Sequence, residues 1–264
     1  MENSSYYKGV ILDIDGTLLL HGKALPGAGE ATAALRRAGY QLRFVSNTTS
    51  RSEAQLAQVL LLQGIDASEA EIQTSVSACL CFLQSHFSDK KGFIAVPEAL
   101  QTRFSQLEQC GEQPDYVVLG DLDEGFNYAI LNRIFNFIRN GAQLIVFHKN
   151  NWYFRDGKTW LDSGAFTRAL ELAGNTQAVV VGKPSPVMFQ SAIQCMGLPK
   201  DQVLVVGDDV TTDVDGARNA GLPFLLVGSG KFKPADLTTH NIPQNHFIST
   251  IIGLPEWLQY RVTY

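Results

Sequence analysis

Four groups of polar residues in this sequence each follow a short apolar run, and their side chains are of the kinds that phosphoryl transfer needs. The first group is Asp13 and Asp15, directly after Val10, Ile11 and Leu12. The others are Ser46 with Asn47, Lys183 after Gly182, and Asp208 with Asp209 and Asp213. A carboxylate can attack phosphorus or move a proton, while a hydroxyl and an ammonium hold phosphate oxygens. The residue types therefore indicate phosphoryl-transfer chemistry.

A divalent cation is the expected companion of these carboxylates. Aspartates gathered alone would repel a phosphate group through their like charge. Mg²⁺ prefers hard oxygen ligands and keeps waters and phosphate oxygens in its shell. The pattern therefore predicts Mg²⁺ as the cofactor.

The apolar runs before these groups predict the strands that must position them. Strands are expected at 10–12, 41–45, 178–181, 203–206 and 224–227. Helices are expected at 31–38, from a capping box of Ser50 and Glu53 to Gly64, at 186–196 and at 211–220. Short strands that alternate with helices predict a parallel sheet covered on both faces. Because ligands of such sheets bind beyond the carboxyl ends of the strands, the four polar groups should meet at one edge.

The middle of the chain has strands and helices of its own. Strands are expected at 93–96, 116–119 and 144–147, and helices at 99–109, 128–140 and 166–173. We interpret residues 76–177 as an inserted second domain, with residues 1–75 and 178–264 forming the core domain. The predicted fold class is α/β.

Each polar group also has a structural explanation. Asp13 and Asp15 are also typical of turns, and Asp208 or Asp209 of a helix cap. Ser46 could be an ordinary polar residue at the end of a strand, and a lysine before proline, as at Lys183, is most often a solvated loop residue. Four such coincidences, in order and each at a strand end, explain the pattern less well than one shared site.

The same residues resemble the motifs of the haloacid dehalogenase superfamily. The segment from Val10 to Leu18 is similar to its first motif, and Ser46 and Lys183 to its second and third. Gly207-Asp208-Asp209, with Asp213 four residues on, is similar to the fourth. The insert resembles the class II cap of the class IIA (NagD-like) subfamily, although Asp162-Ser163-Gly164 stands where relatives often carry a Pro-Gly or Gly-Pro step. The resemblance implies a three-layer Rossmann-like core with an α/β class II cap.

The resemblance also implies a role for each motif residue. Asp13 would be the nucleophile that becomes phosphorylated, and Asp15 the acid and base that favours release to water. Magnesium would be held by Asp13, the backbone carbonyl of Asp15, and Asp208, with Asp209 and Asp213 around that shell. The phosphate-binding residues would be Asp13, Ile14, Asp15, Ser46, Asn47 and Lys183.

Three functions fit these residues. The first is a phosphohydrolase for a small phosphorylated substrate, roofed by a mobile cap. His148 to Trp152 lies where a loop of that cap could meet substrate, but its aromatic residues fit the core of the cap equally well. The second is a phosphotransferase of the mutase type with the same nucleophile, and the third is a non-catalytic phospholigand-binding module. Sugar phosphates, nucleotides, pyridoxal phosphate, pyrophosphate and phosphoamino acids all remain open as substrates.

Composition limits the partners and the location. The chain has 264 residues and a formal net charge of -5 with no long basic run, which argues against a nucleic-acid surface. No apolar stretch is long enough for a membrane span, and the polar segment Met1 to Lys8 is not a signal peptide. Cys79, Cys81, Cys110 and Cys195 show neither a zinc spacing nor a disulfide framework. We therefore expect a cytoplasmic protein, and the resemblance suggests a homodimer through the cap.

Overall fold

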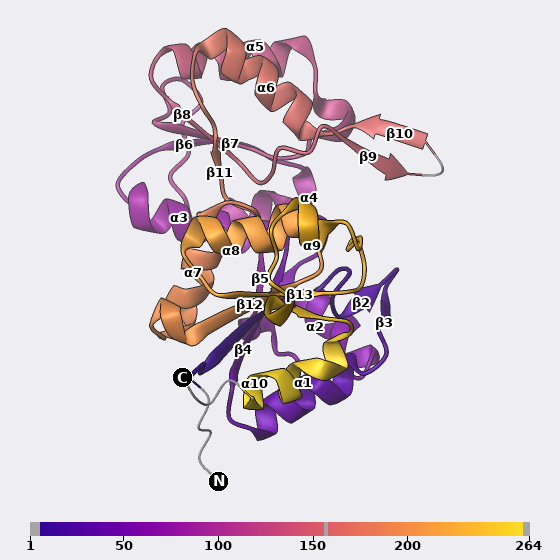
Figure 1. Cartoon of the computed structure of the whole chain (residues 1–264). Helices are drawn as coiled ribbons and strands as arrows, with labels where there is room; N and C mark the ends of the chain where they lie inside the picture. Colours follow the sequence, from indigo (N-terminus) through magenta and orange to yellow (C-terminus); the bar gives the residue numbers. More distant parts are fainter. Residues whose placement is uncertain (1–5, 156–157, 261–264) are drawn as a thin grey trace. The chain divides into compact units, whose positions relative to one another are not determined.

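The computed structural model describes residues 6–155 and 158–260, which form two compact units (Figure 1). One unit combines the described residues up to Thr74 with those from Lys183 onward, and the other is Ser75–Gly182. The first five residues of the polar N-terminal segment lie outside the described residues.

The first unit is built on a six-stranded parallel sheet. Its strands, in spatial order, are β14 (Phe247–Ile248), β13 (Phe224–Val227), β12 (Val203–Gly207), β1 (Gly9–Asp13), β4 (Gln41–Ser46) and β5 (Ile72–Thr74). Every residue of β1 and β12 is buried, as expected of central parallel strands with both faces covered. The predicted strands of this sheet are confirmed except for 178–181, and β5 and β14 carried too short an apolar signal to be predicted.

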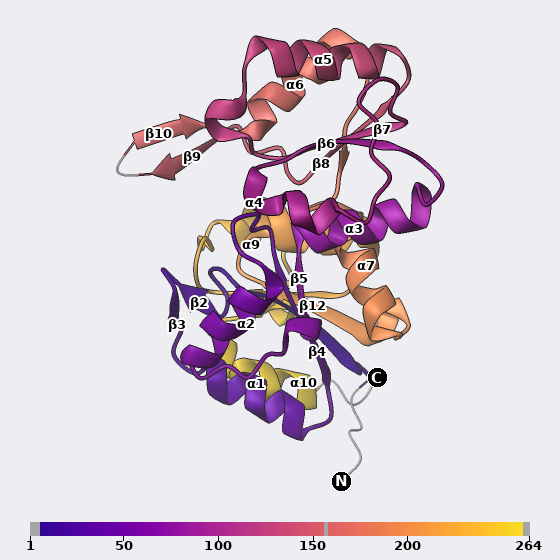
Figure 2. The ribbon, with the colours of Figure 1, turned by 180° about the vertical axis from the view of Figure 1, so that it is seen from behind.

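Helices cover both faces of this sheet, which gives three layers (Figures 1 and 2). Helices α1 (Ala28–Arg37), α2 (Glu53–Leu62) and α10 (Leu254–Gln259) pack in one core cluster with alternate residues of the strands. Helices α7 (Pro186–Met196) and α8 (Asp215–Ala220) pack against each other on the other side. A short hairpin, β2 (Leu19–Leu20) and β3 (Lys23–Ala24), and the one-turn helix α9 (Asp236–Thr239) complete the unit.

The start of α2 differs from its prediction. Its N-cap is Ser52, whose hydroxyl accepts from the Gln55 amide at 3.2 Å while the Gln55 side chain accepts from the Ser52 amide at 2.9 Å. The capping box predicted from Ser50 and Glu53 is therefore wrong. Glu53 instead lies inside the protein and accepts a hydrogen bond of 2.7 Å from Thr74 Oγ1, because a buried carboxylate needs a partner.

The second unit has a four-stranded parallel sheet of its own. Its order is β11 (Val179–Val180), β8 (Gln143–Val146), β7 (Tyr116–Leu119) and β6 (Gly92–Ala95). The unit also holds α3 (Ser75–His86), α4 (Glu98–Gln101), α5 (Tyr128–Arg139), α6 (Ser163–Gly174) and an antiparallel hairpin of β9 (Trp152–Arg155) and β10 (Lys158–Leu161). Helix α5 has a buried stripe of Ile134, Phe137 and Ile138, which packs with the strands in the core of this unit.

Two predictions for this part of the chain are wrong, and one element was not predicted. The strand predicted at 178–181 as part of the core sheet pairs with β8 instead, since a short Val-Val run carries no signal of which sheet it joins. The helix predicted at 99–109 is only α4 and a 3₁₀ turn to Phe104, because the polar stretch after it supplies no apolar stripe. The hairpin β9–β10 was not predicted.

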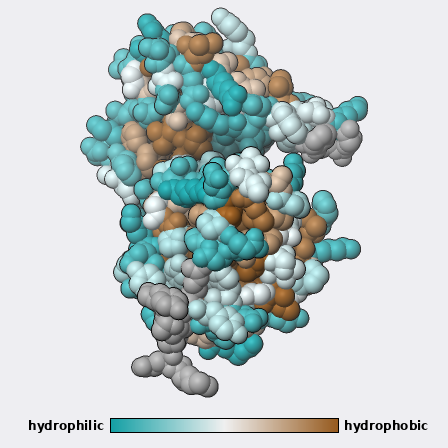
Figure 3. Space-filling view, in the orientation of Figure 1, coloured by the Kyte–Doolittle hydropathy of each residue, from teal (hydrophilic) through white to brown (hydrophobic). Residues whose placement is uncertain are grey.

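Hydrophilic residues interrupt the hydrophobic ones over both units on the face shown in Figure 3. No helix within residues 6–155 and 158–260 is long and apolar enough to cross a membrane.

Candidate active site

The predicted polar groups of the core unit meet at the carboxyl edge of its sheet. Asp13 is the last residue of β1, Ser46 is the last residue of β4, and Asp208 follows β12 directly. These three strands are neighbours at the centre of the sheet, in the order β12-β1-β4. The sheet topology therefore brings together residues that are almost 200 positions apart in the chain.

Lys183 joins this edge through two buried carboxylates. Its Nζ donates to Asp13 Oδ1, and also to Asp213 Oδ1 at 2.7 Å. All three side chains are almost completely buried. Burial alone would lower the pKa of Lys183, but Asp13 and Asp213 outweigh it and hold that pKa above its ordinary value. The two carboxylates therefore favour the charged form of this lysine.

A third buried carboxylate leaves the site with an excess of negative charge. Asp13, Asp208 and Asp213 each offer an oxygen within 4.8 Å of the others. Three carboxylates against the one ammonium of Lys183 leave two negative charges uncompensated. Burial, assisted by the neighbouring carboxylates, accordingly holds the pKa of Asp13 well above its usual range. A divalent cation would balance the two excess negative charges, and it prefers hard oxygen ligands such as these carboxylates.

The chain itself fixes both oxygens of the Asp208 carboxylate. Thr17 Oγ1 donates to Oδ1 at 2.9 Å, and the backbone amide of Lys231 donates to Oδ2 at 2.7 Å. Each carboxylate oxygen keeps a second lone pair, so these bonds leave Asp208 able to ligate a metal. The side chain is thus held in one orientation at the edge of the sheet.

The segment after Asp208 turns Asp213 back toward the site. Residues Val210–Val214 form a single π-helical turn, an irregularity that is frequent at functional sites. Asp213 Oδ2 accepts from the Asp209 amide at 3.1 Å. A Cβ on Gly207 would lie 2.3 Å from Asp213, so only glycine permits this approach. Asp209 points elsewhere and accepts from Lys231 Nζ at 2.8 Å.

Asp15 differs from the buried carboxylates because it is exposed. Ser46 Oγ donates to its Oδ2 at 3.3 Å, and the same hydroxyl accepts from the Thr48 amide at 3.2 Å. The side chain of Asp15 is therefore outside the buried cluster and open to reactants and water. This position suits proton transfer.

Asn47 holds the backbone of Lys183 rather than its ammonium. Its Oδ1 accepts from the Lys183 amide at 2.7 Å, and its Nδ2 donates to the Lys183 carbonyl at 2.8 Å. Ile14 is fully buried, and its amide donates to the Val45 carbonyl at 3.2 Å. The predicted phosphate contact of Ile14 stays a prediction.

Comparison with known proteins agrees with this geometry. A family model described as haloacid dehalogenase-like hydrolase matches residues 10–110, and one described as HAD-hydrolase-like matches residues 180–254. Haloacid dehalogenase-like hydrolase domain-containing protein 2 of Rattus norvegicus is 37% identical over 236 residues, which cover 89% of this chain and 90% of that protein. The chain belongs to the haloacid dehalogenase-like hydrolases.

Two further relatives place this hydrolase within the family. Phospholysine phosphohistidine inorganic pyrophosphate phosphatase of Rattus norvegicus is 35% identical over 241 residues, covering 89% of this chain and 88% of that protein. The solved structure of NagD from E. coli K-12 is 26% identical with a TM-score of 0.83, and the match covers 93% of this chain and 97% of that one. The hydrolase therefore has the NagD-like fold, an α/β core with a separate α/β cap unit.

Three residues of the hydrolase contribute to the site without having been given a role from the sequence. Thr17 and Lys231 hold Asp208, and Ser229 Oγ donates to the Gly16 carbonyl at 2.7 Å. In the sequence, Gly228-Ser229-Gly230 directly after a strand could have indicated a loop that contributes to the site, but an ordinary loop has the same composition. Their contacts depend on the packing of β13 beside β12, which a local pattern does not reveal.

The second unit of the hydrolase contains the remaining predicted candidates. His148 is buried, its Nδ1 accepts from the Asn150 amide at 3.4 Å, and its Nε2 lies 4.0 Å from Asp162 Oδ1. Trp152, at the start of β9, is 56% exposed. The structure thus places His148 in the interior of its unit and Trp152 on the surface, and a substrate contact by either stays a prediction.

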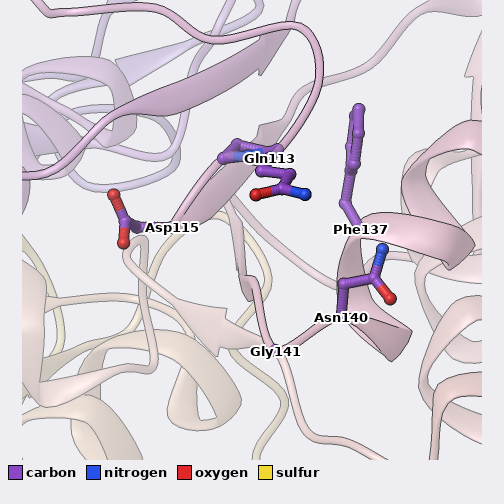
Figure 4. A pocket seen from close by; sticks show the side chains of 6 residues that line it. Gln113, Asp115, Phe137, Asn140 and Gly141 are labelled. Atoms are coloured by element: carbon purple, nitrogen blue, oxygen red, sulfur yellow. The ribbon is translucent and has the colours of Figure 1, made fainter.

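A cavity of about 450 Å³ in the second unit lies away from these residues. Figure 4 shows it between the segment of Gln113 and Asp115 and the end of α5, which carries Phe137 and is followed by Asn140. Asp115 precedes β7 and Gly141 precedes β8, so the cavity is at the amino ends of the strands. Ligands of parallel sheets bind at the opposite ends, and the cavity holds none of the predicted site residues.

Proposed function

We propose that this protein is a magnesium-dependent phosphatase that cleaves a small phosphorylated metabolite through an aspartyl-phosphate on Asp13. The observation that carries the proposal is the buried group of Asp13, Asp208 and Asp213, whose three carboxylates share the single ammonium of Lys183. Membership of the haloacid dehalogenase-like hydrolases supports it, and one relative is named as a phosphatase.

In the first step, an Asp13 carboxylate oxygen forms a bond to phosphorus while the bond from phosphorus to the leaving oxygen breaks. The leaving oxygen takes the proton of Asp15, whose exposed position lets it reach that atom. Lys183 contacts Asp13 Oδ1, so its positive charge lies beside the phosphoryl oxygens, which carry negative charge in the transition state. The products of this step are a phosphorylated Asp13 and a neutral alcohol or acid.

In the second step, water attacks phosphorus and gives its proton to Asp15, now a carboxylate. The bond between phosphorus and the Asp13 oxygen breaks, which releases inorganic phosphate and restores both side chains. We propose that the Ser46 hydroxyl turns from Asp15 Oδ2 to a phosphoryl oxygen when substrate binds, and that the Asn47 backbone binds the phosphoryl group with it.

The residues proposed to hold Mg²⁺ are Asp13 and Asp208, with the backbone carbonyl of Asp15. Asp213 accepts hydrogen bonds from Lys183 Nζ and from the backbone amide of Asp209. We therefore assign it the role of positioning these two residues. When bound, Mg²⁺ supplies the positive charge that the buried carboxylates lack and that a phosphate dianion requires.

The test is a phosphatase screen with and without EDTA. The panel holds sugar phosphates, nucleotides, pyridoxal phosphate, phosphoamino acids, inorganic pyrophosphate and p-nitrophenyl phosphate, with phosphate release as the readout. We expect Mg²⁺-dependent release from at least one compound, and none from Asp13→Asn. Asp66→Asn, which changes an exposed aspartate of the same unit, serves as the matched control and keeps full activity.

Further outcomes test the mechanism and separate the alternatives. With p-nitrophenyl phosphate, whose leaving group needs little help from an acid, Asp15→Asn should trap radiolabelled phosphate on the protein, because its second step lacks a base. Phosphate transfer only in the presence of an added acceptor would identify a mutase-type transferase. Equal turnover with and without the chelator, or activity that survives in Asp13→Asn, would refute the proposed mechanism.

A further inference from the structure

The segment Gly228–Lys231 follows β13 and lies against two loops of the site. The Ser229 hydroxyl donates to the Gly16 carbonyl at 2.7 Å, within the loop that carries Asp15 and Thr17. Two residues later, the Lys231 amide donates to Asp208 Oδ2 at 2.7 Å. The segment therefore connects the loop after β1 to the carboxylate after β12.

The packing of Gly230 shows how close this contact is. An added Cβ there would lie 2.1 Å from Asp208 Oδ2 and 2.6 Å from the Gly16 Cα. The φ angle of Gly230 is +52°, in the left-handed region that favours glycine. On the other side, Lys231 Nζ pairs with Asp209 Oδ2 at 2.8 Å. The segment is thus fastened by one hydroxyl and one ion pair, with a glycine between them.

We infer that Gly228–Lys231 is a positioning loop for the metal site, and that Ser229 is the side chain that sets it. This inference rests on the proposed function, since it assumes that Asp208 is a metal ligand. Without the Ser229 hydrogen bond, the ion pair of Lys231 with Asp209 is the remaining side-chain contact that fastens the segment, and the Lys231 amide is held less firmly against Asp208 Oδ2. Groups that orient metal ligands typically contribute 10- to 100-fold to metal affinity.

Ser229 is a sharper probe of this loop than Lys231. Removing the lysine would also remove a positive charge near the site, and that change alone would strengthen the binding of Mg²⁺. Ser229→Ala removes only one neutral hydroxyl, so the electrostatic field of the site stays the same. Ser249→Ala is the matched control, because Ser249 is exposed beyond β14 and its hydroxyl makes no hydrogen bond within the described residues.

The experiment measures Mg²⁺ binding to the full-length protein by isothermal titration calorimetry, without substrate. Wild type and Ser249→Ala should bind with the same Kd, and Ser229→Ala should bind about 10-fold more weakly. Ser229→Thr keeps the hydroxyl and should stay within about twofold of wild type. Thermal unfolding without metal, run in parallel, shows whether each variant is folded.

The outcomes distinguish this inference from the function on which it rests. An unchanged Kd in Ser229→Ala, with or without a lower Tm, overturns the positioning role but leaves the proposed phosphatase intact. If Ser229→Thr also binds Mg²⁺ more weakly, the effect comes from the shape of the side chain rather than from its hydroxyl, and the positioning role is again overturned. Absence of Mg²⁺ binding in wild type would overturn both the positioning role and the metal-dependent mechanism.

Discussion

Lys183 and Asp213 form a buried ion pair, with 2.7 Å between Nζ and Oδ1 and at most 5% of either side chain exposed. The same ammonium also donates to Asp13, so one cation is shared between the proposed nucleophile and a second carboxylate. A buried cation of this kind is held in place by its partners and needs no reorganisation when charge develops beside it. Asp213 thus fixes the position of Lys183 relative to Asp13.

The first prediction concerns the charge of Lys183. Lys183→Met should lower kcat by at least about 10³-fold, because it removes the cation next to Asp13 and leaves three buried carboxylates together. The measurement is steady-state hydrolysis of the best substrate from the screen. Lys233→Met removes an exposed lysine of the same unit and should leave kcat unchanged. A Lys183→Met protein that is folded and retains a tenth of the activity would contradict this role.

A second prediction separates the position of Lys183 from its charge. Asn47→Ala removes both hydrogen bonds to the Lys183 backbone while the ammonium stays. We expect kcat to fall by about 10- to 100-fold, since a small displacement of a catalytic group is costly. The loss should therefore be smaller than that of Lys183→Met. Asn132→Ala, at an exposed position of α5, is the control for an Asn-to-Ala change; equal losses in Asn47→Ala and Lys183→Met would show that the two residues act as one unit.

The carboxyl edge of the core sheet was predictable because its signals are local. The apolar run Val10 to Leu12 ends in Asp13, and the alternation of strands with helices implies parallel pairing. Parallel pairing then places Asp13, Ser46 and Asp208 at one edge without further information. Helix α7 was also predictable to its ends, because Ser185 and Pro186 begin it and Gly197 follows it.

The contacts that were not predicted depend on long-range packing. Ser229 and Lys231 reach Gly16 and Asp208 only because β13 lies beside β12. Likewise, β11 joins the second sheet through its pairing with β8, and two valines alone cannot encode that choice. Glu53 was expected to cap a helix, but its carboxylate is buried and accepts a hydrogen bond from Thr74, which lies 21 residues further along the chain.

The third prediction concerns metal binding and pH. Because burial raises the pKa of Asp13, the metal-free native state holds a proton at pH values where the unfolded chain has lost it. Stability of the metal-free protein should therefore fall as pH rises through the window between the ordinary and the raised value. Mg²⁺ competes with that proton, so its stabilising effect should grow over the same window.

Thermal unfolding at several pH values checks this expectation. At a fixed Mg²⁺ concentration, 100 times the Kd measured at pH 8, Mg²⁺ should add about 2.7 kcal/mol to the stability of wild type at pH 8, and the shift in Tm should be smaller at pH 5.5. Asp208→Asn should abolish the shift at both pH values. A shift of equal size in that variant would place the metal elsewhere.

The last prediction concerns the ion pair of Arg36 and Glu71, which joins α1 to the turn before β5. Arg36 donates to both carboxylate oxygens at 2.6 and 2.8 Å, and the Ser68 amide donates to Glu71 Oε2 at 2.8 Å. Burial raises the pKa of Glu71, but the bonds from Arg36 and Ser68 outweigh it and lower the pKa below its usual value of 4.5. This stabilisation is therefore present above pH 4.5 and is lost as pH falls through the lowered folded-state pKa.

Glu71→Gln should reduce the free energy of unfolding by about 1 kcal/mol at pH 7, since the two side chains are about three-quarters buried and the pair is bidentate. Urea unfolding from pH 7 down to the lowest pH at which wild type still unfolds cooperatively measures the difference. The gap between wild type and variant should close as the carboxyl group becomes protonated, because the protonated acid and the amide carry the same charge. Glu69→Gln, in the same turn but exposed, should follow wild type at every pH. A gap that is independent of pH would mean that Glu71 stabilises the turn through its shape rather than its charge.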